Sequence, residues 1–214
     1  MDATPAHDPI APTPDWGELV SWRRKVSELY ATVRRTSDPA DTVRRFRAER
    51  DELFRSHPQS ALPAAARPNF RGLPYFPYDP AYRVEGTVAA DVPTETFEVE
   101  LGTDGTLRYS RVAVAGFRLL GQPQRLMVYW IEGYGGGLFI PFRDTTSGHT
   151  TYAGGRYLYD TIKGADLGGD DRKLILDFNY AYNPSCAYNP RWVCPLAPRE
   201  NTLTVAVEAG EKAY

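Results

Sequence analysis

Sulfur and histidine are scarce in this chain. Its 214 residues include two cysteines, two methionines and three histidines. A zinc site needs three or four ligands, commonly in close pairs such as CxxC, and Cys186 and Cys194 are too widely spaced for that pattern. The sequence therefore predicts no metal and no cofactor. If a metal did bind, Cys186 and Cys194 would be its weak candidates, with His149 and an aspartate such as Asp177 completing the set.

Long hydrophobic runs and an excess of one charge are also missing. No segment approaches the ~18 consecutive apolar residues of a transmembrane helix. The 25 basic and 27 acidic residues give a net charge of -2, which provides no general attraction to nucleic acid or to an anionic membrane. We therefore expect neither nucleic acid nor a membrane as a partner.

Residues 1–15 do not resemble a secretory signal, because they lack a basic start and an apolar stretch. This predicts a cytoplasmic protein. In a reducing cytoplasm we expect Cys186 and Cys194 to be thiols that fill a tight loop. The seven residues between them would nevertheless permit a disulfide.

The residues that are abundant favour a β-rich fold. Apolar residues make up 42% of the chain and aromatic residues 13%, which is enough for a sizeable core. The 18 glycines, 18 prolines and 14 tyrosines are typical of short strands joined by tight turns.

The sequence pattern divides the chain into successive parts. Residues 1–15 form a proline-rich leader that we expect to be disordered. Residues 16–56 show apolar positions at alternating steps of three and four, which predicts two amphipathic helices. Residues 57–81 are a linker and an aromatic, proline-rich arm, and residues 82–214 form a β-rich domain that carries the conspicuous motifs.

Alternating apolar and polar residues predict about nine short strands in the β-rich part. Because no helical pattern separates them, they indicate a mainly antiparallel β-sandwich or β-barrel, with the helical pair outside it or covering one end. Asp104 and Gly105 are typical of a hairpin turn. The predicted strands are Arg83–Val88, Thr96–Leu101, Leu107–Val114, Phe117–Leu120, Arg125–Glu132, Leu138–Phe142, Tyr152–Tyr159, Lys173–Phe178 and Leu203–Glu208.

Polar residues gather in two segments of the β-rich part. Residues 174–201 hold both cysteines and a duplicated AYNP tetrad, whose Asn-Pro pairs predict turns. The second segment holds Arg143, Asp144, a run of hydroxyl residues and Arg156. Because the planar guanidinium suits carboxylate and phosphate groups, Arg143 and Arg156 could form an anion site. An internal ion pair with Asp144 or Asp177 is an equal alternative.

Residues of the same two segments could also catalyse a reaction. Asp144, Asp177 or Glu200 could act as an acid or a base, with neighbouring tyrosines as hydroxyl donors. Cys186 could act as a nucleophile if a base such as His149 lay beside it.

The motifs together resemble a known family. The runs that carry the resemblance are FRDTTSGHTTYAGGRYL, LDFNYAYNPSCAYNPRWVCPLAPREN and VEAGEK. With similar runs upstream, the likeness spans roughly Val43 to Tyr214, and it is to the bacterial and archaeal family called domain of unknown function 1684. That family usually has Glu where His149 stands, which weakens a catalytic or metal role for the histidine, and often has a second Pro where Ser185 stands.

The family's name implies no activity, but the resemblance marks a set of signature positions. We expect these positions to form one surface or pocket. They are Arg143, Asp144, Tyr152, Arg156, Asp177, Asn179, Asn183, Cys186, Cys194, Glu200 and Asn201.

Three functional hypotheses follow. The first is a module that binds a small polar or anionic molecule through Arg143, Tyr152, Arg156, Asn179, Asn183, Glu200 and Asn201. The second is a hydrolase-like enzyme that uses Asp144, Asp177 or Cys186. The third is a structural or protein-interaction module whose helices meet a protein partner.

Overall fold

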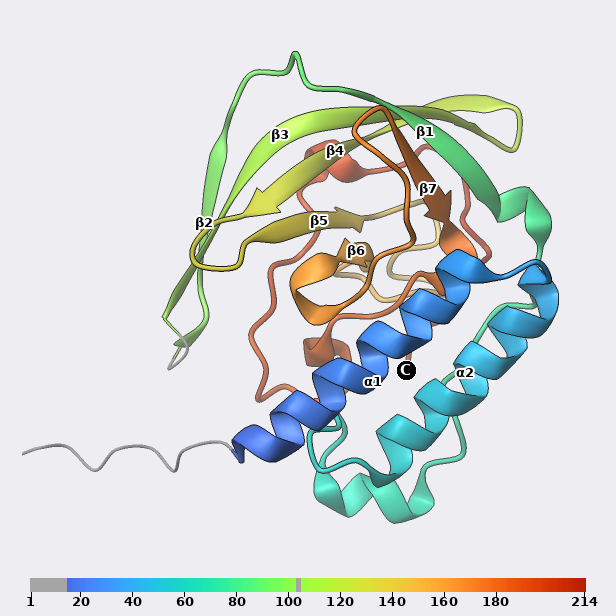
Figure 1. Ribbon diagram of the computed structural model, residues 1–214, viewed down its shortest axis with the longest axis vertical. Helices are drawn as coiled ribbons and strands as arrows, with labels where there is room; N and C mark the ends of the chain where they lie inside the picture. Colours follow the sequence, from blue (N-terminus) through green and yellow to red (C-terminus); the bar gives the residue numbers. More distant parts are fainter. Residues whose placement is uncertain (1–14, 103–104) are drawn as a thin grey trace, which may run out of the picture.

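Two helices and one antiparallel sheet form the framework of the fold (Figure 1). The computed structural model describes residues 15–102 and 105–214, so residues 1–14 of the predicted leader and Asp104 of the predicted hairpin turn lie outside the described residues. The helices are α1 (Trp16–Arg35) and α2 (Pro39–Ser56). The strands are β1 (Arg83–Ala89), β2 (Thr96–Glu100), β3 (Thr106–Leu119), β4 (Gln122–Ile131), β5 (Gly137–Phe142), β6 (Arg156–Asp160) and β7 (Lys173–Asp177).

Local signals set the ends of both helices. The side chain of Asp15 accepts hydrogen bonds from the backbone N–H groups of Gly17 and Glu18, and so caps α1. At α2, Asp38 is the cap and Pro39 the first helical residue, where its missing N–H costs nothing. The two predicted N-terminal helices are confirmed.

The sheet is one curled layer. Its strands are ordered β6-β5-β4-β3-β1-β7, with β2 paired to β3, and every pairing is antiparallel. The mainly antiparallel fold is therefore confirmed. The sheet is a seven-stranded half-barrel, however, and not a sandwich or a closed barrel (Figure 1).

The prediction of about nine strands was too high for local reasons. The segments predicted as separate strands on either side of Gly116 belong to one strand, β3, because its pairing with β4 continues without a break from Ala115 through Gly116 to Phe117. The start of the predicted strand at 152–159 is a turn that ends at Gly155. Residues 203–208 form no strand, because they follow residues 143–145 through scattered backbone bonds, such as Leu203 N–H to Arg143 O.

The core lies between the concave face of the sheet and the helices. Side chains of α1 and α2, including Tyr30 and Phe46, belong to the same buried cluster as Leu126, Phe142 and Leu176 of the sheet. The C-terminal segment, residues 202–214, runs through the interior of the half-barrel toward α2 (Figure 1). The open side of the sheet is thus closed by helices and by irregular chain, which needs hydrogen-bond partners other than strand ladders.

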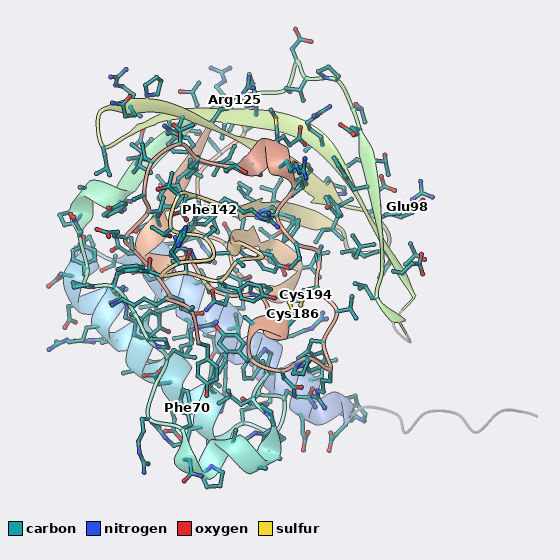
Figure 2. All side chains as sticks on the ribbon, turned by 180° about the vertical axis from the view of Figure 1, so that it is seen from behind. Phe70, Glu98, Arg125, Phe142, Cys186 and Cys194 are labelled. Carbon is teal, nitrogen blue, oxygen red and sulfur yellow. The ribbon has the colours of Figure 1, made fainter. Side chains whose placement is uncertain are left out.

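The aromatic arm packs against the far end of α2. Phe70 and Leu73 share a second buried cluster with Phe54 of α2 and with Tyr188. Figure 2 shows Phe70 at this end of the molecule, away from the sheet. Tyr75 then forms an isolated bridge with Glu211, which joins the arm to the C-terminal segment.

Candidate functional site

Arg156 and Asp144 form a buried ion pair inside the half-barrel. Nη2 of Arg156 lies 2.9 Å from Oδ2 of Asp144, and both side chains are almost completely excluded from solvent. The same guanidinium donates to the backbone carbonyls of Val207, Ala209 and Glu211. Burial lowers the pKa of Arg156, and the neighbouring Asp144 opposes that shift.

The second oxygen of Asp144 is occupied as well. Oδ1 accepts hydrogen bonds from the backbone N–H and the hydroxyl of Thr146 and from the backbone N–H of Val207. Arg143 bonds to the chain through its backbone, and its buried Nε has no hydrogen-bond partner among the described residues. Arg156 and Asp144 are thus engaged with the protein itself, as the internal alternative requires.

Asp177 and Asn179 join the end of β7 to the aromatic arm. Oδ1 of Asp177 accepts from the backbone and side-chain N–H groups of Asn179. Asn179 in turn exchanges hydrogen bonds with the backbone of Asp79 at 2.9–3.0 Å. The pKa of Asp177 is raised, because burial outweighs two opposing contacts. These are the hydrogen bonds from Asn179 and the charge of Arg83, whose Nε lies 3.6 Å from Oδ2 of Asp177.

Glu200 and Asn201 lie against β3, β4 and β5. Glu200 accepts from Arg111 at 2.5 Å and from the hydroxyl of Tyr129 at 2.6 Å. Asn201 is completely buried and bonds to the backbone of Met127 and to the carbonyl of Pro141. These two signature residues therefore fix the C-terminal segment to the sheet.

A small cavity opens between the helices and the signature segment, which is residues 174–201. Its volume is about 80 Å³, and its lining includes Tyr30 and Arg50 from the helices and Asn183 and Cys194 from the signature segment. Glu211 lies beside it and is 1% exposed. Its carboxylate accepts from Arg50 Nε at 2.8 Å and from the backbone N–H of Asn183 at 2.9 Å, and also from the hydroxyl of Tyr188.

Two residues of the cavity lining each carry a buried polar atom that has no hydrogen-bond partner in the described part of the chain. The two atoms are the hydroxyl of Tyr30 and Oδ1 of Asn183. The amide orientation of Asn183 is set because its Nδ2 donates to the carbonyl of Lys212 at 2.8 Å. Burial raises the pKa of Tyr30 well above its usual value, so its hydroxyl keeps its proton.

The two cysteines lie next to each other at the surface of the signature segment (Figure 2). Both are free thiols and partly exposed. The backbone N–H of Cys186 lies 3.4 Å from Sγ of Cys194, and the hydroxyl of Tyr152 lies 3.6 Å from Sγ of Cys186. No group of three or more metal-binding side chains occurs among residues 15–102 and 105–214.

The predicted site residues therefore fall into separate groups. Asn183 and Cys194 share the cavity, Tyr152 and Cys186 share the thiol site, and Arg156 with Asp144 forms an internal network. The pair Asp177 and Asn179 and the pair Glu200 and Asn201 lie at other places on the sheet. His149 is exposed in a turn.

Sequence reasoning missed Tyr30, Arg50 and Glu211. Glu211 lay inside the VEAGEK run, but a single acidic residue there carries no structural signal. Arg50 offered a clearer one, because it stands on the apolar face of α2 between Phe46 and Leu53. A charge at such a position needs a buried partner, here Glu211.

The fold and these sites define a mainly antiparallel β protein whose curled sheet is covered by two N-terminal helices. Residues 68–212 match the family described as protein of unknown function DUF1684, and the chain belongs to that family. It is similar to an uncharacterised protein of Haloarcula marismortui, whose solution NMR structure has a TM-score of 0.60 and 40% sequence identity. The likeness covers 80% of this chain and 92% of the archaeal one. No curated protein matches the sequence.

Among the described residues, neither α1 nor α2 is both long and apolar enough to cross a bilayer.

Proposed function

We propose that the protein binds a small, uncharged polar molecule in the cavity between the helical pair and the signature segment. The observation that carries this proposal is the pair of buried, partnerless atoms, Tyr30 Oη and Asn183 Oδ1, on two residues that line one cavity. A buried polar atom without a partner costs about 1–3 kcal/mol. A bound molecule that meets both atoms would remove that cost.

The hydrogen-bonding capacity of the two atoms describes the ligand. Asn183 Oδ1 is an acceptor, so it needs an N–H or O–H donor. Tyr30 carries a protonated hydroxyl, which can donate or accept. A compact amide, amine or polyol with at least one donor fits this pattern, and a cavity of about 80 Å³ limits it to a few heavy atoms.

The charges around the cavity favour an uncharged ligand over an anion. Arg50 is paired with Glu211 at 2.8 Å, and Lys163 lies 3.4 Å from Asp160. Each cation in the lining thus already has a carboxylate beside it. An anion would have to compete with those carboxylates, whereas a neutral molecule would not.

A first measurement is the native mass of the freshly purified protein compared with its denatured mass. We expect an excess of small-molecule size in the native spectrum. The same protein should show a raised melting temperature with small amides or polyols, and little change with carboxylates of equal size, because ligand binding to the folded state stabilises it.

Two matched tyrosine variants test whether the small molecule binds in this cavity. Tyr30→Phe removes the cavity hydroxyl and should weaken binding by about tenfold, the equivalent of one hydrogen bond. Tyr180→Phe also removes a buried hydroxyl without a partner, but Tyr180 lines a different cleft with Arg34 and Arg83. It should leave binding unchanged.

If neither mass excess nor a melting shift is found, the cavity holds only ordered water, as polar cavities commonly do.

The alternatives are less well supported by the contacts. Asp144 and Asp177 accept hydrogen bonds from neighbouring residues, so neither is placed as a ready base for hydrolysis. A protein partner on the helices remains a prediction, as does a cytoplasmic location. Charged residues make up half of the lining of the open groove between α1 and α2, and this groove identifies no partner; they are Lys25, Glu28, Glu49 and Glu52.

A further inference from the structure

Cys186 and Cys194 are not placed like thiols that only fill space. Both side chains are partly exposed, and each sulfur atom lies beside a polar group, the Tyr152 hydroxyl for Cys186 and the Cys186 backbone N–H for Cys194. Space-filling thiols are typically buried among apolar groups. The AYNP turns and the following loop bring Sγ of Cys194 to 3.4 Å from the backbone N–H of Cys186, although seven residues separate the two cysteines in sequence.

The contacts around the two thiols shift their pKa values in opposite directions. Hydrogen bonding from the Cys194 thiol, helped by the Tyr152 hydroxyl, lowers the pKa of Cys186 to about 6, while partial burial opposes the shift. The same contact raises the pKa of Cys194. Burial and the contact with Cys186 raise the pKa of Tyr152 to about 12, so its hydroxyl stays a donor. With the Tyr152 hydroxyl 3.6 Å from its Sγ and a lowered pKa, Cys186 is the better placed of the two sulfurs to attack.

We propose that Cys186 and Cys194 form a redox-active dithiol that reduces small disulfides, with Cys186 as the attacking and Cys194 as the resolving residue. Cys194 also lines the cavity of the proposed ligand function, but the thiol chemistry requires no ligand there, so the two proposals are tested independently. The partial exposure of both sulfurs admits a low-molecular-weight disulfide more readily than a folded protein substrate.

The reaction balances within the pair and its substrate. The Cys186 thiolate attacks one sulfur of R–S–S–R, forms a Cys186–S–S–R bond and releases RS⁻. Cys194 gives up its proton to that leaving thiolate and attacks the Cys186 sulfur, so that a Cys186–Cys194 disulfide forms and a second RS⁻ leaves and is protonated by solvent. The protein loses two electrons, and the small disulfide gains them. Two molecules of another thiol reverse the exchange and restore the dithiol.

Intact mass measured during reaction with 2-hydroxyethyl disulfide tests the order of events. In the unmodified protein we expect a transient adduct that gives way to a species lighter by two hydrogen atoms. Cys194→Ser should stop at the mixed disulfide on Cys186. Cys186→Ser should react at least about tenfold more slowly, because the remaining thiol is mostly protonated at neutral pH.

The pH dependence of alkylation tests the contacts without any cysteine variant. Iodoacetamide labelling, mapped by peptide mass, should show Cys186 reacting with a midpoint near pH 6 and ahead of Cys194. Tyr152→Phe should move that midpoint upward. Tyr157→Phe is the control, because its hydroxyl holds the same loop through the carbonyl of Pro195 without facing Cys186. It should leave the midpoint in place.

Either of two results would overturn the proposal. One is equal and independent modification of both cysteines in the unmodified protein, with no internal disulfide. The other is a Cys186 midpoint near the ordinary thiol value of about 8.5. Both can be read from the unmodified protein, so they hold even if a variant fails to fold.

Discussion

Arg156 illustrates how one residue can look like a ligand contact and serve the fold. It is 1% exposed, pairs with Asp144 and donates to three carbonyls of the C-terminal segment. We expect Arg156→Met to lower the free energy of unfolding by about 3–5 kcal/mol, because it leaves the Asp144 carboxylate buried and unpaired. Urea unfolding followed by circular dichroism measures the loss.

The matched control for Arg156 is an arginine on the surface of the sheet. Arg108 on β3 lies 3.3 Å from Glu98 and 3.4 Å from Glu132, but its side chain is 56% exposed. Arg108→Met should therefore cost no more than about 1 kcal/mol. Equal losses at Arg156 and Arg108 would show that the buried network does not hold the C-terminal segment.

At the scale of elements, Asn201 replaces a missing piece of the ladder between β4 and β5. The ladder ends where Tyr129 faces Phe139, and beyond it Pro141 has no N–H to donate. The Asn201 amide enters this gap, accepts from the N–H of Met127, and donates to the carbonyls of Met127 and Pro141. An irregular segment thus completes the sheet with a side chain.

We expect Asn201→Asp to cost at least about 3 kcal/mol at neutral pH, because two carbonyls lose their donor and a carboxylate is buried. The new carboxyl should have a raised pKa in the folded state, so part of the stability should return as the pH falls and be lost again as it rises. Urea unfolding at pH 4 and pH 7 checks this. Asn189→Asp keeps its acceptor for the N–H of Arg191 and should change little at either pH.

For the whole molecule, Glu211 links three parts of the chain that are distant in sequence. It bonds to Arg50 of α2 and to Asn183 and Tyr188 of the signature segment, and its backbone pairs with Tyr75 of the arm. The carboxylate is therefore the point at which the helices, the arm and the half-barrel meet. We infer that it makes them unfold as one unit.

Glu211→Gln tests that inference. The amide leaves the charge of Arg50 without its partner and presents N–H groups to other donors, which should cost about 3–5 kcal/mol. Unfolding curves from far-ultraviolet circular dichroism and tryptophan fluorescence should coincide in the unmodified protein and separate in the variant. Glu208→Gln, an exposed change in the same segment, should leave the curves together. Coincident curves in Glu211→Gln would assign the coupling to other contacts.

The local features of the fold could be predicted from the amino-acid pattern. Helix spacing and caps such as Asp38 with Pro39 predicted both helices, and alternation predicted antiparallel strands, because these signals act between residues close in the chain. The motifs also identified the family. Alternation was misleading at residues 203–208, where the segment has the pattern of a strand and no free ladder to join.

The pairing of distant polar groups, in contrast, follows from the folded arrangement of the chain. It set Arg156 against Asp144, placed Asn183 with Tyr30 around one cavity, and brought Arg50 of α2 to Glu211, 161 residues away. Spacing along the chain cannot fix such pairs, because a buried charge or amide is satisfied by whichever segment the packed core brings next to it. The closing of the half-barrel by irregular chain, and not by more strands, follows from those long-range contacts.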